Sequence, residues 1–462
     1  PAEQTDEVNV QLNEITPDEL NPEELTLIDP ASGSGHILVE AYDLFKAIYL
    51  ERGYRSRDIA KHILEKSLFG LDIDQRAAQL TGFALMMKGR EDDRRLFERG
   101  VKLNVMAMID STSLDVETLV HGIDLSQLGS TQCLTAEDLT ALKDLFEHAT
   151  TFGSLIQVPQ NLAEKIPVLK QLSETNSQDM FVKEGLEHLE PLVKQAEILA
   201  AKYDAVVANP PYMGVKGMNG LVKTFAKDYF LNAKADLFSC FIERGFTLGK
   251  DIGHNAMVTM QSWMFLPSFE ELRKKILRNK TVYTMAHLGS RAFDTISGEV
   301  VQTTSFVLKN RLVESYRPVF FRLLGGGEQE KQTMLANGEC RFDTVEQEEL
   351  LGIPRAPIAY WASRADRTAF LNGVGLAKVS QPRSGMSTGN TEAFIHYWWE
   401  VPSNHIGFEQ CSKNPAKRFY PHNKAGGGRR WFGYSYYIIK YGDNDLAMME
   451  ASDGFRHDNR DL

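Results

Sequence analysis

Apolar and polar positions follow two different spacings over the first 310 residues. Short apolar runs predict buried strands. They lie at 25–29, 67–72, 203–208, 254–260, 282–288 and 303–308. Between them, apolar residues recur every three or four positions, which predicts helices. The predicted helices lie at 36–50, 61–66, 75–88, 237–248 and 268–277, the last with Ser268 as its N-cap. Strands that alternate with helices predict an α/β fold with a doubly wound, mainly parallel sheet.

A long helical stretch interrupts this alternation. Residues 116 to about 200 are rich in Leu, Glu and Lys and show no strand pattern, so we expect a helical insertion in the sheet. We therefore predict a first domain over 1–310 that contains the insertion. The pattern is then irregular over 311–375, which predicts a connector, and aromatic over 376–462, which predicts the start of a second domain.

The composition and the two ends of the sequence narrow the class of protein. No apolar run approaches the roughly 20 residues that span a bilayer. The four cysteines are scattered without CxxC spacing, which predicts free thiols in a reducing, cytoplasmic compartment and no metal site. The sequence begins without a methionine and ends in a polar run, so we expect a piece of a longer protein with a truncated second domain.

A glycine-rich turn, Asp29-Pro30-Ala31-Ser32-Gly33-Ser34-Gly35, follows the first predicted strand. Its glycines let the backbone approach a ligand closely, and Asp29 can accept hydrogen bonds from a cationic amino group. Asp72 ends the next strand, where an acid binds ribose hydroxyls in nucleotide-binding sheets. No lysine follows the glycines as in a P-loop, and the spacing is not GxGxxG. The pattern favours a cationic nucleoside without phosphates, such as S-adenosylmethionine.

A second turn, Asn209-Pro210-Pro211-Tyr212, follows the strand at 203–208. The prolines fix φ, which predicts a rigid elbow at the carboxyl edge of the sheet, where open α/β folds bind ligands. The Asn209 side chain and the Pro210 carbonyl can accept hydrogen bonds from an exocyclic amino group. Tyr212 offers a stacking face for a planar base. The elbow therefore predicts methyl transfer to an amine, catalysed mainly by orientation.

Together these motifs resemble those of amino-methyltransferases that use S-adenosylmethionine. Longer segments over residues 25–310, such as KYDAVVANPPYMGVKGMN and MVTMQSWMFLPSFEELRKKIL, are similar to the large adenine-specific DNA methyltransferases of BREX phage-resistance systems, the PglX family. GMSTGNTEAFIHYWWEV and RFYPHNKAGGGRRWFGY resemble the start of that family's target-recognition region. The resemblance implies a Rossmann-like methyltransferase sheet that methylates adenine N6 in duplex DNA and so marks host DNA.

The resemblance also implies roles for individual residues. Cofactor contacts are expected from Asp29, Pro30, Ala31, Ser32, Gly33, Gly35 and Asp72. Asn209, Pro210 and Pro211 form the catalytic elbow that holds adenine N6, with Tyr212 stacking on one face of the flipped base and Phe293 on the other. For the cofactor's adenine we favour Phe152-Gly153-Ser154-Leu155, with Ser154 as a further cofactor contact, and Asp110 is the alternative.

The implied partners are double-stranded DNA and other BREX defence proteins. The net charge of −11 counts against a dedicated nucleic-acid binder, which is usually basic, but residues 413–430 concentrate positive charge. The candidates there for DNA contacts are Lys417, Arg418, Lys424, Arg429 and Arg430. The surrounding aromatic residues fit the packing of a small domain equally well. An acidic DNA mimic from a phage would compete for the same surface.

Three other functions fit parts of the pattern. A type IIG restriction enzyme carries the same methyltransferase, although no PD…(D/E)xK cluster is visible on a predicted strand. A protein-glutamine methyltransferase also uses an NPPY elbow, but such enzymes are short. A DNA-binding subunit without catalysis is the third, and the intact elbow argues against it.

Overall fold

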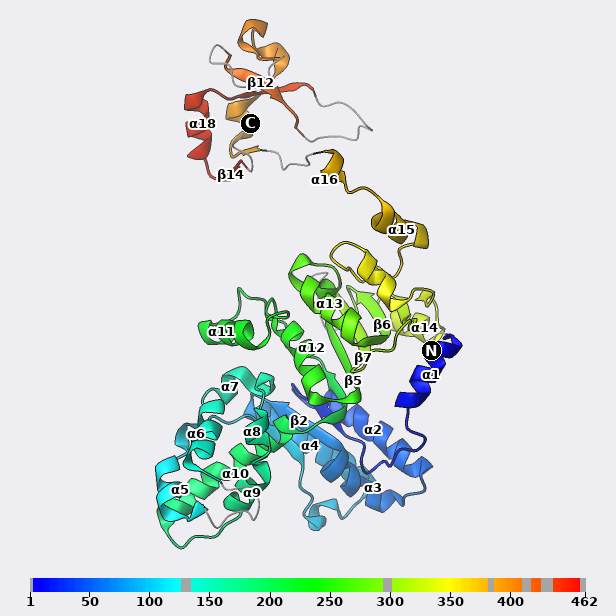
Figure 1. Ribbon diagram of the computed structural model, residues 1–462, viewed down its shortest axis with the longest axis vertical. Helices are drawn as coiled ribbons and strands as arrows, with labels where there is room; N and C mark the ends of the chain where they lie inside the picture. The colour runs from blue at the N-terminus through cyan, green and yellow to red at the C-terminus, as the bar shows by residue number, and fades with distance from the viewer. Residues whose placement is uncertain are drawn as a thin grey trace. The chain divides into compact units, whose positions relative to one another are not determined.

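The chain folds into two compact units, Pro1–Leu371 and Asn372–Leu462, which we describe separately. The computed structural model describes residues 3–125, 134–293, 301–380, 386–408, 417–424 and 435–457 (Figure 1). In these residues no helix is long and apolar enough to cross a membrane.

One large sheet forms the centre of the first unit. Across the described residues its strand order is β3-β2-β1-β4-β5-β7-β6-β8-β9. The strands are β1 (Leu27–Asp29), β2 (Leu68–Asp72), β3 (Asn104–Ala107), β4 (Tyr203–Ala208), β5 (Gly249–Met260), β6 (Thr281–Gly289), β7 (Thr303–Lys309), β8 (Val319–Arg322) and β9 (Arg341–Phe342). β1 to β5 are parallel, whereas β7 runs antiparallel between β5 and β6. The predicted α/β class with a Rossmann-like, mainly parallel sheet is confirmed.

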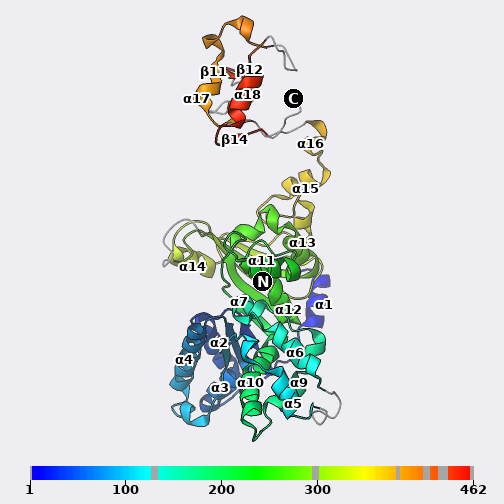
Figure 2. The same cartoon turned by 90° about the vertical axis from the view of Figure 1, so that its left-hand side faces the viewer.

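The alternation of side chains gives this sheet two apolar faces. On β1, Leu27 belongs to one hydrophobic core and Ile28 to the other. The Leu27 side is covered by α2 (His36–Glu51), α3 (Ser56–His62), the π-helical turn Ile63–Ser67 and α4 (Gln75–Asp92). The Ile28 side is covered by the insertion, α12 (Leu237–Leu248) and α13 (Glu270–Asn279). Figure 2 shows α2–α4 and the insertion on opposite sides of the sheet.

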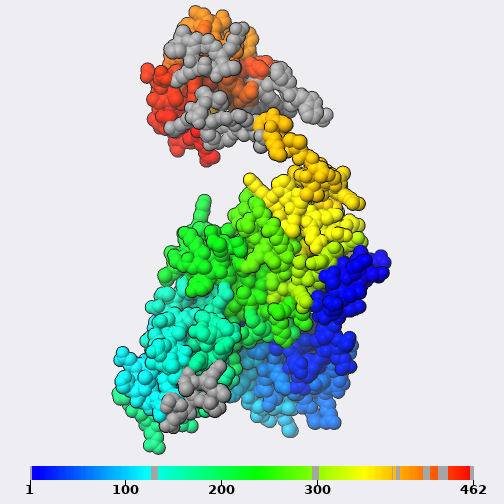
Figure 3. All heavy atoms as spheres, viewed as in Figure 1, coloured from blue at the N-terminus to red at the C-terminus, as the bar shows by residue number. Residues whose placement is uncertain are grey.

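The insertion is helical, as predicted. Its described helices are α5 (Val116–Gly122), α6 (Ala136–Leu145), α7 (Ala149–Phe152), α8 (Gln160–Ala163), α9 (Ile166–Ser173) and α10 (Met180–Ala200). Their buried leucines join the core on the Ile28 side of the sheet. In the space-filling view the insertion, coloured cyan, forms a lobe continuous with the green segment that follows it (Figure 3).

Strand pairing brings three predicted functional positions to one edge. β1 lies between β2 and β4, with Asp29 opposite Gly70 and Ile28 opposite Val206. Because neighbouring parallel strands end at the same edge, the turn after Asp29, the acid Asp72 and the elbow after Ala208 lie side by side.

Three parts of the first unit differ from the prediction. Ser268 is not an N-cap, because Pro267 starts a short 3₁₀ turn and α13 begins only at Glu270. β3 was missed although residues 105–109 form an apolar run, and its own residues are only partly buried. Residues 311–375 were expected as a connector, but the part up to Leu371 belongs to the first unit, adds β8 and β9 to the sheet and contains α14 (Glu328–Ala336).

The second unit has little regular structure in its described residues. A three-stranded antiparallel sheet has the order β11-β13-β12. Its strands are β11 (Ile395–Tyr397), β12 (Phe419–His422) and β13 (Tyr437–Lys440), and α18 (Asp443–Glu450) follows. Smaller elements are α16 (Leu376–Val379), β10 (Ser387–Thr388), α17 (Thr391–Phe394) and β14 (Phe455–Arg456). The assignment of this unit to target recognition stays a prediction.

Candidate active site

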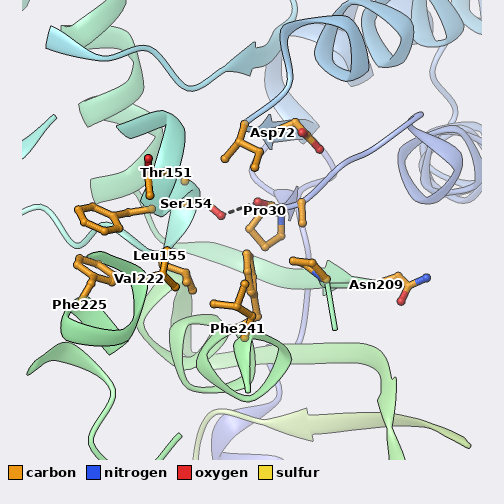
Figure 4. Close-up of a pocket in the computed structure, with 15 residues that line it drawn as sticks. Pro30, Asp72, Thr151, Ser154, Leu155, Asn209, Val222, Phe225 and Phe241 are labelled. Atoms are coloured by element: carbon orange, nitrogen blue, oxygen red, sulfur yellow. Dashed lines mark hydrogen bonds between the residues drawn. The ribbon is translucent and has the colours of Figure 1, made fainter. Parts of the chain in front are cut away.

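A cavity of about 340 Å³ lies at the carboxyl edge of the sheet. Its wall combines the ends of β1, β2 and β4 with the insertion, α11 (Gly220–Tyr229) and α12. Pro30, Ala31, Asp72, Ser154 and Asn209 line it (Figure 4). A cavity of this size falls at the lower end of the range for small-molecule sites.

Asp29 supports the first turn from behind the cavity wall. Its side chain is buried, with 1% of its surface exposed, and it does not line the cavity. Its Oδ1 accepts a hydrogen bond from the Ala31 N–H at 3.0 Å. Burial raises the pKa of Asp29 to about 7, and the nearby charge of Asp72 adds to this shift. The hydrogen bond from Ala31 lowers the pKa but is outweighed. Asp29 is therefore a positioning residue in this geometry, and Pro30 and Ala31 form the surface.

The two predicted glycines have different surroundings. Gly33 has φ +53°, and a Cβ placed on it would meet nothing within 4 Å, so open space lies beside its backbone. Gly35 has φ +84°, but a Cβ there would lie 2.9 Å from the Thr81 side chain. Glycine is needed at position 35 because the turn packs closely against α4. At position 33 it leaves the backbone open to an approaching group.

Ser32 contributes a polar atom without a partner. Its residue is 5% exposed, and its hydroxyl makes no hydrogen bond within the described residues. Its backbone N–H donates to the Leu71 carbonyl at 2.9 Å, which fixes the turn between the first two strands. A buried hydroxyl without a bond is uncommon in proteins, and Ser32 directly follows Pro30 and Ala31 of the cavity wall without lining the cavity itself.

Asp72 is held by two backbone donors. Its Oδ2 accepts from the Gly33 N–H at 2.8 Å, and its Oδ1 accepts from the Asp74 N–H at 2.9 Å. An ionised carboxylate has about four lone-pair directions, so each oxygen keeps capacity for another donor. Asp72 can therefore bind two hydroxyl groups without giving up the bonds that orient it.

The insertion closes the cavity. The Ser154 hydroxyl donates to the Pro30 carbonyl at 2.5 Å, a bond drawn in Figure 4. Next to it, the ring of Phe152 stacks on Phe225 of α11 with centroids 4.2 Å apart. Phe152 to Leu155 lie in the wall, whereas Asp110 lies outside it and binds the backbone and hydroxyl of Thr150. The geometry therefore favours the Ser154 segment over Asp110 as the wall that meets a planar group.

The elbow forms the opposite part of the wall. Asn209 and Pro211 line the cavity, Pro210 is buried, and the Asn209 side chain is exposed. The Tyr212 hydroxyl donates to Asn209 Oδ1 at 3.1 Å. Burial raises the pKa of Tyr212 to about 12, so this hydroxyl stays protonated near neutral pH. Figure 4 shows Asn209 on the far side of the cavity from Phe225.

The predicted residues outside this cavity have different settings. Phe293 follows β6 and is half-buried. In the second unit, the guanidinium of Arg418 makes two bonds of 2.8 and 2.7 Å to the buried carboxylate of Asp445. Lys417 donates to the Asn404 carbonyl, and Lys424 lies 5.3 Å above the ring of Tyr437. Arg429 and Arg430 lie outside the described residues.

Sequence reasoning missed several residues of the wall. Ile73, Val222 and Phe225 line the cavity, but each looks like an ordinary apolar residue in the sequence. It also missed Arg244, which is 3% exposed and donates to the carbonyls of Ser154, Ile156 and Leu199 at 2.8, 2.8 and 3.1 Å. A lone arginine in an apolar helix was the only available signal. Arg244 holds the insertion against α12.

The chain is similar in sequence to known proteins. Residues 66–293 match the family model of the Eco57I restriction-modification methylase. The chain is 45% identical to the adenine-specific methyltransferase BrxX of Escherichia coli O9:H4 (strain HS), over 100% of this chain and 39% of BrxX. It is 35% identical to the adenine-specific methyltransferase PglX of Lacticaseibacillus casei (strain Zhang), over 93% of this chain and 36% of PglX. The chain thus spans less than half the length of these curated relatives.

Among solved structures, the chain is similar to a nuclease-deletion mutant of the Type ISP restriction-modification enzyme LlaGI in complex with a DNA substrate mimic. The TM-score is 0.42 at 12% identity, over 73% of this chain and 25% of that one, which is too distant to carry an argument about function. The sequence matches are closer. The chain belongs to the family of adenine-specific methyltransferases that includes BrxX and PglX.

Proposed function

We propose that this chain is the methyltransferase part of a site-specific DNA methyltransferase that modifies adenine N6 and uses S-adenosylmethionine. One observation carries the proposal: the glycine-rich turn, Asp72 and the NPPY elbow border a single cavity. A cofactor site and an amine-binding elbow must adjoin if a methyl group is to pass between them.

The residues present fit the cofactor. The backbone beside Gly33 is open, the buried Ser32 hydroxyl has no partner in the described residues, and Asp72 keeps free acceptor capacity. Asp72 would bind the ribose hydroxyls, and the wall of Ile73 and Phe152 would contact the adenine ring. When bound, S-adenosylmethionine supplies an electrophilic methyl group on a sulfonium.

The elbow would hold the target amine. The Asn209 amide oxygen and the Pro210 carbonyl accept hydrogen bonds from the adenine N6 amino group and so orient its lone pair. The proline pair keeps both acceptors fixed, so little reorganisation is needed when the amine attacks. Tyr212 would support the base by stacking and hold the Asn209 oxygen through its hydroxyl. Since the pKa of Tyr212 is raised to about 12, this residue acts as a donor and not as a base.

The substrate and the biological role extend this proposal to the whole protein. An adenine in a duplex must be flipped out of the stack before its amino group can reach the elbow. We propose duplex DNA as the substrate and marking of host DNA in a BREX phage-defence system as the role, with other BREX proteins as partners in the cytoplasm. The identity to BrxX and PglX supports this role. An acidic phage protein that mimics DNA would block the surface that binds the duplex.

The test is sequencing of N6-methyladenine in host DNA from cells that carry the full-length gene and its neighbours. Three strains are compared: wild type, Asn209→Ala, and Asn13→Ala as a control at an exposed position of α1 (Asp6–Ile15). We expect methylation at one short motif in the wild type and the control, and none in Asn209→Ala. Methylation that persists in Asn209→Ala would contradict the role of the elbow, and its absence from the wild type would contradict the reaction.

A further inference from the structure

A second, open hollow of about 700 Å³ lies beside the elbow. We call it the lysine hollow, after Lys223, Lys227 and Lys234 in its wall. Its lining also includes the apolar residues Val215, Met218, Leu231 and Ala235, which we call its floor. Its lining residues come from α11, from the loops on either side of that helix, and from the start of α13 with the turn before it.

Backbone hydrogen bonds tie this hollow to the elbow. The Met213 N–H, directly after Tyr212, donates to Asp236 Oδ1 at 2.9 Å, and the Met213 carbonyl accepts from Leu237 N–H at 3.1 Å. Two residues on, the Val215 N–H donates to the Ala235 carbonyl at 3.3 Å. The segment that directly follows the elbow is therefore hydrogen-bonded to the chain around Ala235, which lines the hollow, so the hollow and the elbow are held near one another.

Positive charge in this segment is unbalanced. Residues 213–235 contain four lysines, the fourth being Lys216, and one acid, Asp228, in a chain of net charge −11. In the described part of the chain, none of these lysines makes an ion pair or a side-chain hydrogen bond, unlike Lys274 nearby. Glu271, the acid in the wall of the hollow, binds Lys274 at 2.9 Å. The hollow is thus a site of surplus positive charge on an acidic protein.

Helix α11 separates the hollow from the cofactor cavity. Lys223 and Lys227 are four residues apart and share one helix face, which borders the hollow. Val222 and Phe225 are three residues apart and share another face, which lines the cofactor cavity. The same short helix therefore presents apolar groups to the cofactor side and ammonium groups to the side beyond the elbow.

We propose that the lysine hollow binds the sugar–phosphate backbone of the DNA strand that carries the target adenine, next to the flipped nucleotide. This inference rests on the proposed function. Three ammonium groups match the charge of a run of phosphates, and the apolar floor suits the sugars between them. Bound here, the strand is held beside the point where the base leaves the helix. The hollow positions the strand and does not read its sequence, since phosphates are the same at every step.

The test uses the full-length protein with the triple substitution Lys223→Gln, Lys227→Gln and Lys234→Gln. The matched control is Lys102→Gln, Lys143→Gln and Lys183→Gln, which removes the same charge from other surfaces of the first unit. DNA affinity is measured over a range of KCl concentrations. Affinity falls as salt rises, and each lost phosphate contact reduces the steepness of log affinity against log salt by about 0.9. We expect the steepness to fall by about 2 to 3 in the hollow variant and by less than 1 in the control.

A second measurement locates the contact. Methylphosphonate linkages, which carry no charge, replace the phosphates on either side of the target adenine. We expect them to weaken binding of the wild type and the control by about 10-fold and to leave the hollow variant unchanged, because its contact is already lost. Equal weakening of all three proteins, or equal salt slopes in the two triple variants, would overturn the inference. Methylation by the wild type is scored in the same preparations, so failure of the proposed function is seen separately.

Discussion

The phenol of Tyr212 donates a hydrogen bond to the amide oxygen of Asn209 across 3.1 Å. This bond joins the two side chains of the elbow before any substrate is present. With the hydroxyl as donor, the Asn209 oxygen keeps a second lone pair for an incoming amine. The elbow is thus oriented for its proposed substrate by its own fourth residue.

Two substitutions of Tyr212 should distinguish the contribution of its hydroxyl to the methylation rate from that of its ring. Tyr212→Phe keeps the stacking face and loses one hydrogen bond, worth about 1 kcal/mol, so we expect a fall in the methylation rate of about 5-fold. Tyr212→Ala also loses stacking, worth about 1–3 kcal/mol per base, and should lower the rate by a further 5- to 150-fold. Single-turnover methylation of a duplex with one target site measures both.

The control for these variants is the affinity for S-adenosylmethionine, which neither substitution should change because Tyr212 does not line the cavity. If Tyr212→Phe is as inactive as Tyr212→Ala, the ring is not the stacking surface. The hydroxyl would then account for the whole effect of the residue.

Gly33 and Gly53 form a matched pair for the cofactor site. Both have positive φ, +53° and +82°, and a Cβ on either meets nothing within 4 Å. Alanine at either position should cost about 1 kcal/mol of stability, because an L residue is strained there. Only Gly33 lies in the cofactor turn, so only Gly33→Ala should weaken S-adenosylmethionine binding, by about 10-fold or more. Isothermal titration of both variants measures this, and equal affinities would argue against a close approach of the cofactor to Gly33.

Substitution of Arg244 should lower both the folding free energy and the affinity for the cofactor. Arg244→Met leaves three buried carbonyls without their donor, and we expect a loss of about 3–5 kcal/mol of folding free energy. Arg244→Lys reaches fewer carbonyls, so it should fold but hold the Ser154 segment loosely. The dissociation constant of S-adenosylmethionine should then rise several-fold.

The control for Arg244 is Arg273, another buried arginine in the described residues whose guanidinium donates to backbone carbonyls. It donates to the carbonyls of Trp263, Leu266, Arg355 and Ala356, away from the cavity. Arg273→Lys should lower stability to a similar extent and leave cofactor affinity unchanged. Equal losses of affinity in both lysine variants would mean that Arg244 acts only through general stability.

Local sequence signals were sufficient to predict the parts of the site that directly follow strands. The turn after Asp29, the acid Asp72 and the elbow at Asn209 each combine an apolar run with residues of special backbone or polar chemistry. Parallel pairing then brings them to one edge without further information. The main elements of the first 310 residues could be placed for the same reason.

The remaining wall depends on contacts between distant segments. Phe152 and Phe225 stack although 72 intervening residues separate them, and Arg244 binds carbonyls up to 90 residues away. No local pattern encodes such a contact. The role of Asp29 was also invisible, because the sequence shows an acid at a strand end but not its burial behind Ala31.

Asp29 should make the stability of the first unit depend on pH. Its pKa is about 7 in the folded chain and 3.8 when unperturbed, so between these values the folded state keeps a proton that the unfolded state has lost. Stability therefore falls as pH rises through this window. The amide in Asp29→Asn cannot ionise, so we expect the stability advantage of this variant over wild type to grow by about 3 kcal/mol between pH 5 and pH 8.

Urea unfolding of both proteins at a series of pH values measures this difference, with Asp115→Asn as the control. Asp115 caps α5, and hydrogen bonds from the Thr118 hydroxyl and backbone hold its pKa below its ordinary value. The stability that ionised Asp115 contributes is lost only well below pH 5, so the effect of Asp115→Asn should be constant between pH 5 and pH 8. A constant effect of Asp29→Asn over the same range would mean that Asp29 is ionised throughout. The buried carboxylate would then be stabilised by a positive group outside the described contacts.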